Sequence, residues 1–261
     1  MTGLTRQLVG AVEMVIYTGQ TGIPTVSLGK LRFRLHSPRM LTAFSNRGPQ
    51  EELLRFRQAQ VSCIESLHRL YERAVKLVDP SQAQVFLIYS MLVEDSVYVE
   101  MVHTYIQTQG MTAEYAVSMT GESFSSAFSS LEDEYMRARG EDVRNVCNFL
   151  INTLIGFRET QEHWDEPVIL VDSEFSPEEI LDMERENIRA LVAQRGSMSA
   201  HAAELARALG IPAAAQMDIP PILEGRMAVL DGVEGKLYID PDPELFEQLK
   251  GRTAACSCCG V

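Results

Sequence analysis

The chain has 261 residues, 46% of them hydrophobic, which suffices for one large or two modest globular domains. Its formal net charge of −13 argues against a nucleic-acid partner, since contact with a phosphate backbone needs clustered Lys and Arg. No apolar run approaches the roughly 20 residues that cross a bilayer, and Glu13 interrupts the apolar stretch near the amino terminus. We therefore expect a cytoplasmic protein without a membrane span.

The first part of the chain predicts strands and turns followed by a long helical region. Strands joined by turns are predicted for the segment VEMVIYTGQTGIPTVSLGKLRFRL. Apolar residues then keep three- and four-residue spacings from about residue 50, and Asp79-Pro80 ends that first helix. A second helix is predicted to run to about Gln109. Three shorter helices follow at about 112–119, 122–138 and 141–156, with Gly121 and Gly140 as the breaks between them.

After residue 157 short strands and helices alternate. VILVD at 168–172 predicts a buried strand, Ser176 with Glu179 predicts a capping box, and IRALVAQ at 188–194 predicts another strand. A helix at about 202–209, a short strand PAAAQ and a hairpin MAVLDGVEGKLYID follow. This alternation is typical of an α/β domain, formed here by both ends of the chain with a helical domain inserted.

One histidine lies where a predicted strand meets a predicted helix. Residues 195–212 read RGSMSAHAAELARALGIP, so a glycine and two serines precede His201. A helix amino terminus presents unpaired backbone N–H groups and the positive end of the helix dipole, which favour an anion. Position alone leaves two roles for His201: a residue that carries a phosphate, or a histidine whose hydrogen bonds are satisfied at a helix end.

The same run resembles the phosphohistidine motif of phosphoenolpyruvate-utilising enzymes, a Gly-Gly-x-Thr-Ser-His run followed by Ala-Arg and Gly-Ile-Pro. His201 and the later Ala-Arg and Gly-Ile-Pro keep the spacing of that motif. Three further segments resemble parts of the amino-terminal half of enzyme I of the bacterial sugar phosphotransferase system. They are DEYMRARGEDVRNV, VFLIYSMLVEDSVYVEMV and VILVDSEFSPEEI. The resemblance covers about residues 40–250 in order.

The resemblance implies a fold of two intertwined domains. We expect an α/β swivelling phosphohistidine domain with an inserted all-α helical bundle. The α/β domain is expected to be discontinuous, from 1–47 and 158–250, and the helical, carrier-docking domain to span 48–157. Residues 251–261 are expected to form a flexible Cys-rich tail.

The resemblance also implies a phosphotransfer function. His201 would carry a phosphoryl group and exchange it with a histidine-containing phosphocarrier protein, with Ser199, Arg207 and Gly196 supporting the phosphate. An ion pair is the alternative role for Arg207. In enzyme I a barrel that binds phosphoenolpyruvate and Mg²⁺ follows this region, and the resemblance stops before it. No cofactor is therefore expected in this chain, and a separate phosphoenolpyruvate-binding subunit would supply the phosphate.

Some positions depart from the family pattern. Ile180 stands where enzyme I commonly has a hydroxyl that orients the active histidine. Leu87 and Tyr89 stand where the carrier-binding helix often has Glu and His, and with Glu94 they are expected on an exposed docking surface that faces His201. A degenerate paralogue that acts as a regulatory or partner-binding module is the alternative function.

The cysteines raise a third class of function. Cys63 and Cys147 lie within helical patterns and are expected to be buried free thiols. Cys256, Cys258 and Cys259 crowd the tail as CSCC and are weak candidates for binding a soft metal. Three ligands at a terminus lack the paired spacing of a structural zinc site.

Overall fold

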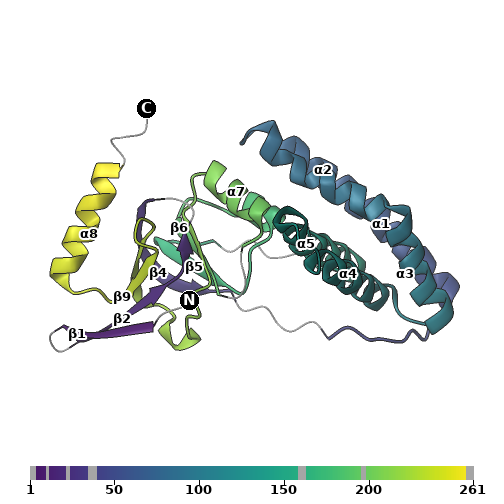
Figure 1. The fold of residues 1–261 in the computed structure, drawn as a ribbon, viewed down its shortest axis with the longest axis horizontal. Helices are drawn as coiled ribbons and strands as arrows, with labels where there is room; N and C mark the ends of the chain where they lie inside the picture. The colour runs from purple at the N-terminus through teal and green to yellow at the C-terminus, as the bar shows by residue number, and fades with distance from the viewer. Residues whose placement is uncertain are drawn as a thin grey trace. The chain divides into compact units, whose positions relative to one another are not determined.

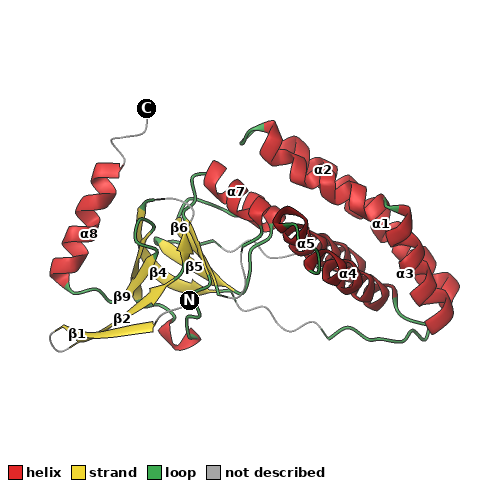
Figure 2. Ribbon diagram, in the orientation of Figure 1, coloured by secondary structure: helices red, strands yellow, loops and turns green. Residues whose placement is uncertain are grey.

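The computed structural model describes residues 4–9, 12–21, 24–34, 40–157, 163–194 and 198–256. The chain divides into two compact units, one made of residues 1–36 and 161–261 and the other of residues 37–160. We call them the sheet unit and the helical unit, after the elements that Figure 2 shows in each. The division falls at 36/37 and 160/161, whereas the sequence placed it at 47/48 and 157/158.

The described helices of the helical unit are α1 (Pro49–Ala74), α2 (Pro80–Glu94), α3 (Ser96–Gln109), α4 (Ala113–Ser129) and α5 (Glu134–Ile155). They begin at Gly48 in α1 and at side-chain caps in α2 to α5. The prediction of one helix from Pro80 to Gln109 is wrong, because Asp95 has extended backbone and accepts hydrogen bonds from the N–H groups of Val97 and Tyr98. That geometry caps a new helix.

Two glycines predicted to separate helices lie inside them. Gly121 is within α4 and Gly140 within α5, and these two helices pack closely against each other. A Cβ atom on Gly121 would lie 2.7 Å from the Cys147 sulfur, and one on Gly140 would lie 3.0 Å from the Ser125 carbonyl oxygen. The glycines thus serve close helix packing and not termination, so the predicted breaks are wrong.

The described strands of the sheet unit form one mixed sheet with the order β1-β2-β9-β8-β4-β5-β6-β7-β3. The strands are β1 (Leu4–Val9), β2 (Val12–Thr18), β3 (Gln20–Thr21), β4 (Val26–Phe33), β5 (Val168–Asp172), β6 (Ile188–Ala193), β7 (Ala213–Ala215), β8 (Met227–Asp231) and β9 (Lys236–Ile239). Neighbours from β4 to β7 run parallel, and the other pairs are antiparallel. The predicted strands at 168–172 and 188–194 and the hairpin at 227–240 are confirmed.

The sheet closes on itself at Gly19. This residue joins β2, which pairs with β9, to β3, which pairs with β7 near the other end of the strand order. A Cβ atom on Gly19 would lie 2.4 Å from the Ala215 carbonyl oxygen. Only glycine permits that approach without movement of the backbone. One face of the curled sheet carries the main apolar core: Tyr17, Leu31, Ile169, Val171, Ala190, Val192, Ala214, Met217, Ile219, Ala228, Leu230, Leu237 and Ile239.

Among the described residues, three α-helices and a short 3-10 helix, η1 (Pro221–Leu223), complete the sheet unit. Helix α6 (Pro177–Asp182) packs against α7 (Ala200–Ala208), and α7 also contacts β7. Helix α8 (Pro243–Cys256) packs on β4 and β8, where Leu249 joins a second apolar cluster. Figure 1 labels both α7 and α8. Residues 251–256, expected within the flexible tail, continue α8, and the rest of that tail lies outside the described residues.

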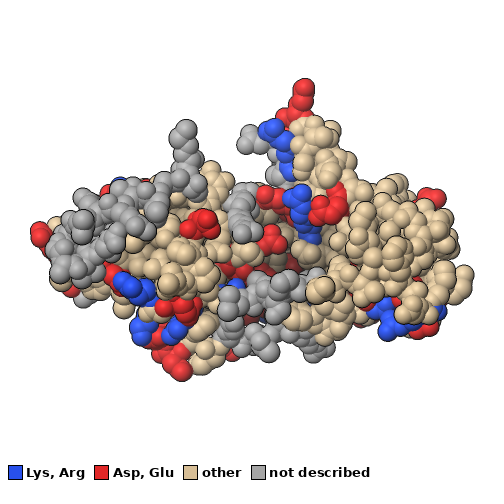
Figure 3. Space-filling model, turned by 90° about the horizontal axis from the view of Figure 1, so that it is seen from below, with Lys and Arg blue, Asp and Glu red and all other residues tan. Residues whose placement is uncertain are grey.

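Two properties of the described residues bear on partners. None of their helices is both long and apolar enough to pass through a bilayer. On the face drawn in Figure 3, Lys and Arg side chains occur in small groups beside acidic ones. This mixed surface accords with a chain whose net charge is −13.

Candidate functional site

The carboxyl ends of the parallel strands meet at one edge of the sheet. Arg34 directly follows β4, Asp172 ends β5, and Gln194 directly follows β6. The N–H of Gln194 donates to the Asp172 carbonyl oxygen at 2.8 Å, which extends the ladder between β5 and β6 by one residue. In α/β folds, both open and closed, ligands bind at the carboxyl ends of parallel strands. Helix α7 begins a few residues beyond Gln194, so its amino terminus belongs to the same edge.

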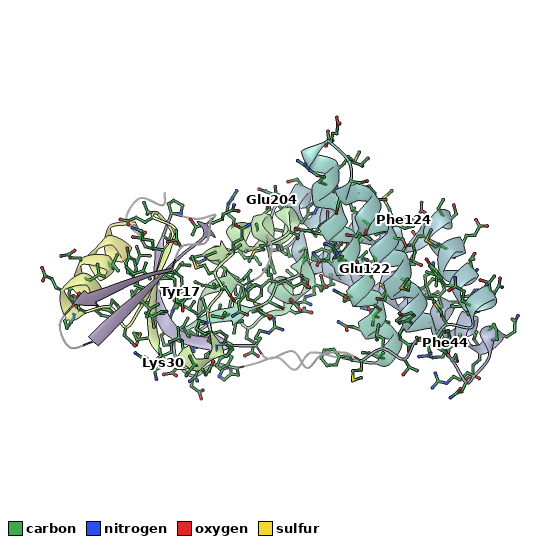
Figure 4. All side chains as sticks on the ribbon, turned by 60° about the horizontal axis from the view of Figure 1, so that its bottom comes forward. Tyr17, Lys30, Phe44, Glu122, Phe124 and Glu204 are labelled. Atoms are coloured by element: carbon green, nitrogen blue, oxygen red, sulfur yellow. The ribbon has the colours of Figure 1, made fainter. Side chains whose placement is uncertain are left out.

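His201 is the second residue of α7 and is half-buried. The helix begins slightly before the predicted Ala202 and has Ser199 as its N-cap. Ala203 N–H donates to the Ser199 carbonyl oxygen at 2.9 Å, which closes the first turn. His201 thus lies in the first helical turn, where the helix dipole favours negative charge. Glu204, three residues later, is exposed on the same helix (Figure 4).

Ser199 supports the helix through its side chain. Its hydroxyl oxygen accepts a hydrogen bond from the N–H of Ala202 at 3.2 Å, and the residue is 4% exposed. The oxygen thus satisfies a backbone donor of the first turn, the usual role of an N-cap serine. Support of a phosphate by Ser199, which the family resemblance implied, stays a prediction.

Arg207 and Gly196 were also expected to support the phosphate. Arg207 is exposed in the last turn of α7, about 9 Å along the axis from His201 at 1.5 Å per residue. A cation there complements the negative end of the helix dipole, which favours the structural role for Arg207. Gly196 lies outside the described residues. Both phosphate roles stay predictions.

Helix α6 has the capping box that the sequence predicted. The N–H of Ser176 donates to the Glu179 carboxylate at 2.9 Å, and the N–H of Glu179 donates to the Ser176 hydroxyl at 3.4 Å. Ile180 is completely buried in this helix, which packs against α7. Position 180 therefore presents a methyl-bearing side chain to a buried environment where the family resemblance led us to look for a hydroxyl.

The expected partner surface of the helical unit is only partly exposed. Glu94 is exposed at the end of α2 and Leu87 is half-buried. The expectation that Tyr89 is exposed is wrong, because Tyr89 is 1% exposed. Its hydroxyl donates to the Asp142 carboxylate at 3.2 Å and accepts from the Asn145 amide at 3.3 Å, both on α5. Tyr89 thus belongs to the interface between α2 and α5.

Arg34 and Asp172 are residues of the sheet edge that sequence reasoning missed. A guanidinium nitrogen of Arg34 lies 3.3 Å from the Asp172 carboxylate, whose side chain is fully buried. One signal was present in the sequence, since Asp172 directly follows the apolar run VILV. Its partner could not be read from the sequence, because Arg34 follows a strand that is far away along the chain.

The cysteines behave differently in the two units. Cys63 and Cys147 are buried free thiols, as predicted. Burial raises the pKa of Cys147 to about 12, and the hydrogen bond with Tyr98 opposes this shift only in part. Cys256 ends α8, and Cys258 and Cys259 lie outside the described residues. Within the described ranges no group of three or more His, Cys, Asp or Glu side chains is placed to hold a metal ion.

Comparison with known proteins decides the family. Residues 18–139 match the family described as PEP-utilising enzyme, N-terminal, and residues 164–235 match its mobile domain. The chain belongs to the PEP-utilising enzymes. His201 lies in the part that matches the mobile domain, and α1 to α4 lie in the part that matches the N-terminal family.

Individual relatives narrow the resemblance to enzyme I. The phosphoenolpyruvate-protein phosphotransferase of Bacillus subtilis (strain 168) is 28% identical over 220 residues, which cover 83% of this chain and 39% of that protein. A solution structure of Enzyme I superposes with a TM-score of 0.69 at 26% identity, covering 92% of this chain and 99% of that one. The N-terminal domain of Enzyme 1 - Nitrogen gives a TM-score of 0.57 at 26% identity over 90% and 98% of the two chains. The chain thus spans about two fifths of the curated relative and nearly all of the solved fragments.

Proposed function

We propose that this chain carries a phosphoryl group on His201 and exchanges it with a histidine-containing phosphocarrier protein. The observation that carries the proposal is the position of His201. It lies half-buried in the first turn of α7, at the carboxyl edge of parallel strands, within the stretch that matches the mobile domain. The resemblance to the N-terminal part of enzyme I supplies the reaction class.

The chemistry needs little beyond alignment. A neutral imidazole has one nitrogen with a free electron pair, and that pair attacks phosphorus while the bond between phosphorus and the nitrogen of the donor histidine breaks. The donor ring leaves as a neutral imidazole because it takes up a proton on its other nitrogen, and the phosphorylated His201 ring releases its N–H proton, so the exchange needs neither an oxidant nor a net proton. Catalysis is then largely positioning and stabilisation of charge on the phosphoryl oxygens.

The first turn of α7 offers that stabilisation. A phosphoryl group brings about 1.5 to 2 negative charges at neutral pH, and the start of a helix favours an anion by about 0.3 to 1 kcal/mol at exposed sites. The Ser199 cap keeps the turn in place by engaging the N–H of Ala202. In this proposal Ser199 contributes by holding the helix start beside His201.

The helical unit would supply the docking surface for the carrier. Glu94 is exposed where α2 meets α3, and Met91 and Val97 nearby are 69% and 60% exposed. Leu87 adds a half-buried apolar side chain to the same helix as Met91. Exposed apolar residues with acidic neighbours suit a partner whose contact face is apolar with basic groups at its rim. Because Tyr89 is buried, it no longer argues for a changed partner.

The test is phosphorylation by a complete donor system. The protein is incubated with phosphoenolpyruvate, Mg²⁺, complete enzyme I and its phosphocarrier, and its intact mass is measured. We expect the mass of one phosphoryl group to be added, with a linkage that is labile to acid and stable to base. His201→Ala should abolish the addition and keep the fold.

A second variant controls for the loss of any histidine. His163→Ala removes a histidine of the sheet unit whose side chain is 62% exposed, and it should label like the wild type. Phosphate on the His201→Ala protein would move the site elsewhere. A wild-type protein that never labels would refute phosphotransfer and favour the partner-binding alternative.

A further inference from the structure

A buried charge cluster occupies the carboxyl edge of the sheet next to the His201 helix. A guanidinium nitrogen of Arg34 lies 3.3 Å from the Asp172 carboxylate and 3.8 Å from the Glu179 carboxylate. The three side chains are 12%, 0% and 20% exposed. One guanidinium therefore faces the end of β5 and the first turn of α6 at the same time.

Burying charged side chains costs free energy of folding. Removing a carboxylate from water costs several kcal/mol, and a well-packed apolar pair of similar volume often stabilises a fold as well as an ion pair does. Asp172 meets the cost with hydrogen bonds from the Ser173 N–H at 2.6 Å and the Ser173 hydroxyl at 3.2 Å, in addition to Arg34. The Arg34 contacts are ion pairs, and because one cation attracts carboxylates of two elements, it holds the end of β5 and the start of α6 near each other.

The cluster reaches His201 along two routes. The Asp172 carbonyl oxygen accepts the N–H of Gln194, which precedes the approach to α7. Glu179 accepts the N–H of Ser176 in the capping box of α6, and α6 packs against α7. Arg34 thus joins the end of β5 to the start of α6. The end of β5 is hydrogen-bonded to Gln194, and α6 packs against α7, the helix that carries His201.

We propose that Arg34, acting through Asp172 and Glu179, is a positioning residue for phosphoryl transfer at His201. The role rests on the proposed function, since it concerns the placement of the same imidazole. Ile180 supplies no hydroxyl on α6, so in this proposal the ring is oriented through the placement of α6, which packs against α7. Arg34 pairs with Glu179 in the first turn of α6 and so holds α6 near the sheet edge.

The test compares Arg34→Met with Arg34→Lys in the full chain. Arg34→Met keeps length and removes charge, and Arg34→Lys keeps charge without the planar fork. Two quantities are measured: the single-turnover rate of phosphoryl exchange with the phosphocarrier, and the tautomer of the His201 ring from two-bond ¹H–¹⁵N couplings. A small misplacement of a reacting group costs about 10- to 100-fold in rate, so we expect at least about a tenfold loss in Arg34→Met with a changed tautomer ratio. Arg34→Lys should recover part of both.

Two further variants separate positioning from stability. Arg34→Met leaves Asp172 without its cation, so the double variant Arg34→Met/Asp172→Asn removes both charges and keeps a folded protein for the same measurements. Arg226→Met removes another arginine of the sheet unit, one paired with Asp240, and should leave the rate and the ring signals unchanged. Wild-type rate and ring signals in the Arg34 variants would overturn the proposal. If the wild type never labels, the proposed phosphotransfer is refuted. The positioning role is then decided by the tautomer ratio of the His201 ring: a ratio that changes in the Arg34 variants supports it, and an unchanged ratio overturns it.

Discussion

At the residue scale, the site depends on one short cap. Ser199 has its side chain almost fully buried and its hydroxyl oxygen on the N–H of Ala202, so the hydroxyl defines where α7 begins. The histidine two positions later is placed by that start, since each residue of a helix advances it by a fixed rise and rotation. A motif serine read from the sequence as a phosphate contact thus has a structural role that the folded backbone makes visible.

Replacing Ser199 with Ala should destabilise the protein by about 1 kcal/mol, because it removes the N-cap acceptor. Ser199→Thr keeps the hydroxyl and should stay within a few tenths of a kcal/mol of the wild type. Urea unfolding followed by circular dichroism measures both. An Ala variant as stable as the wild type would show that the cap contributes nothing. Loss of phosphorylation that Thr restores would add a direct phosphate role for Ser199.

At the element scale, the helical unit shows how packing overrides local propensity. Glycine is a poor helix former, costing about 1 kcal/mol relative to Ala in a helix interior, which is why Gly121 and Gly140 predicted breaks. In the structure α4 and α5 run through both glycines, because each lies where its partner helix comes close. The propensity cost is offset by tertiary contact between the two helices.

Gly121→Ala should therefore destabilise the protein by about 1 to 2 kcal/mol, because overpacking against Cys147 outweighs the gain in helix propensity. Gly251 is the matched control. It lies in α8, is exposed, and a Cβ atom there would meet nothing within 4 Å, so Gly251→Ala should stabilise by up to about 1 kcal/mol. Chemical unfolding compares the two. In Gly121→Ala/Cys147→Ala the sulfur is gone, and the two substitutions should cost less together than the sum of their separate effects. Equal effects at Gly121 and Gly251 would contradict the packing argument.

At the scale of the whole molecule, the helical unit holds the segment that leads into it. Glu52 on α1 is 1% exposed and accepts from the Ser45 hydroxyl at 2.6 Å, from Arg55 at 2.5 Å and from the N–H of Ala113 at 3.0 Å. The N–H of Thr112 donates to the Ala43 carbonyl oxygen at 3.1 Å, which fastens the same segment to the start of α4. One carboxylate thus joins the incoming chain, α1 and α4.

The charge of Glu52 should make this unit sensitive to acid. Burial alone would raise the pKa of Glu52, but the hydrogen bonds from Ser45, Ala113 and Arg55 outweigh burial and lower the pKa below its ordinary value of 4.5. A carboxylate whose folded pKa is depressed stabilises the fold above its unfolded pKa and loses that contribution as pH falls through the folded value. The stabilisation from Glu52 is therefore complete at neutral pH, begins to decline near pH 4.5 and is lost as the pH falls further through the lower folded pKa.

Glu52→Gln should cost about 1 to 3 kcal/mol at pH 7, because charge-assisted hydrogen bonds are lost in a buried place, and less at pH 3. Thermal and urea unfolding at the two pH values measure the difference. Glu65→Gln changes an exposed acid of the same helix, 4.0 Å from Arg69, and should stay within about 0.5 kcal/mol at either pH. An identical loss for Glu52→Gln at both pH values would rule out the linkage to its ionisation.

Several features of this protein follow from its sequence alone. Apolar periodicity predicted α1 and the strands β5 and β6, and the Ser176 and Glu179 side chains predicted the cap of α6. The motif around His201 indicated the family of PEP-utilising enzymes. The matches of this chain to the N-terminal and mobile-domain families then showed it. These features depend on residues close together in the chain, because periodicity and capping are local properties of the backbone.

Only the tertiary structure decided the rest. The closure of the sheet at Gly19, the burial of Tyr89 against α5, and the pairing of Arg34 with Asp172 each join residues from distant parts of the chain. The alternation of apolar and polar residues in a strand, or their period in a helix, predicts that a residue lies on an apolar face or at a strand end. These patterns do not predict which element packs there. That choice depends on steric fit and on the satisfaction of buried polar groups in the assembled fold, so it becomes visible only when the strands and helices are in contact.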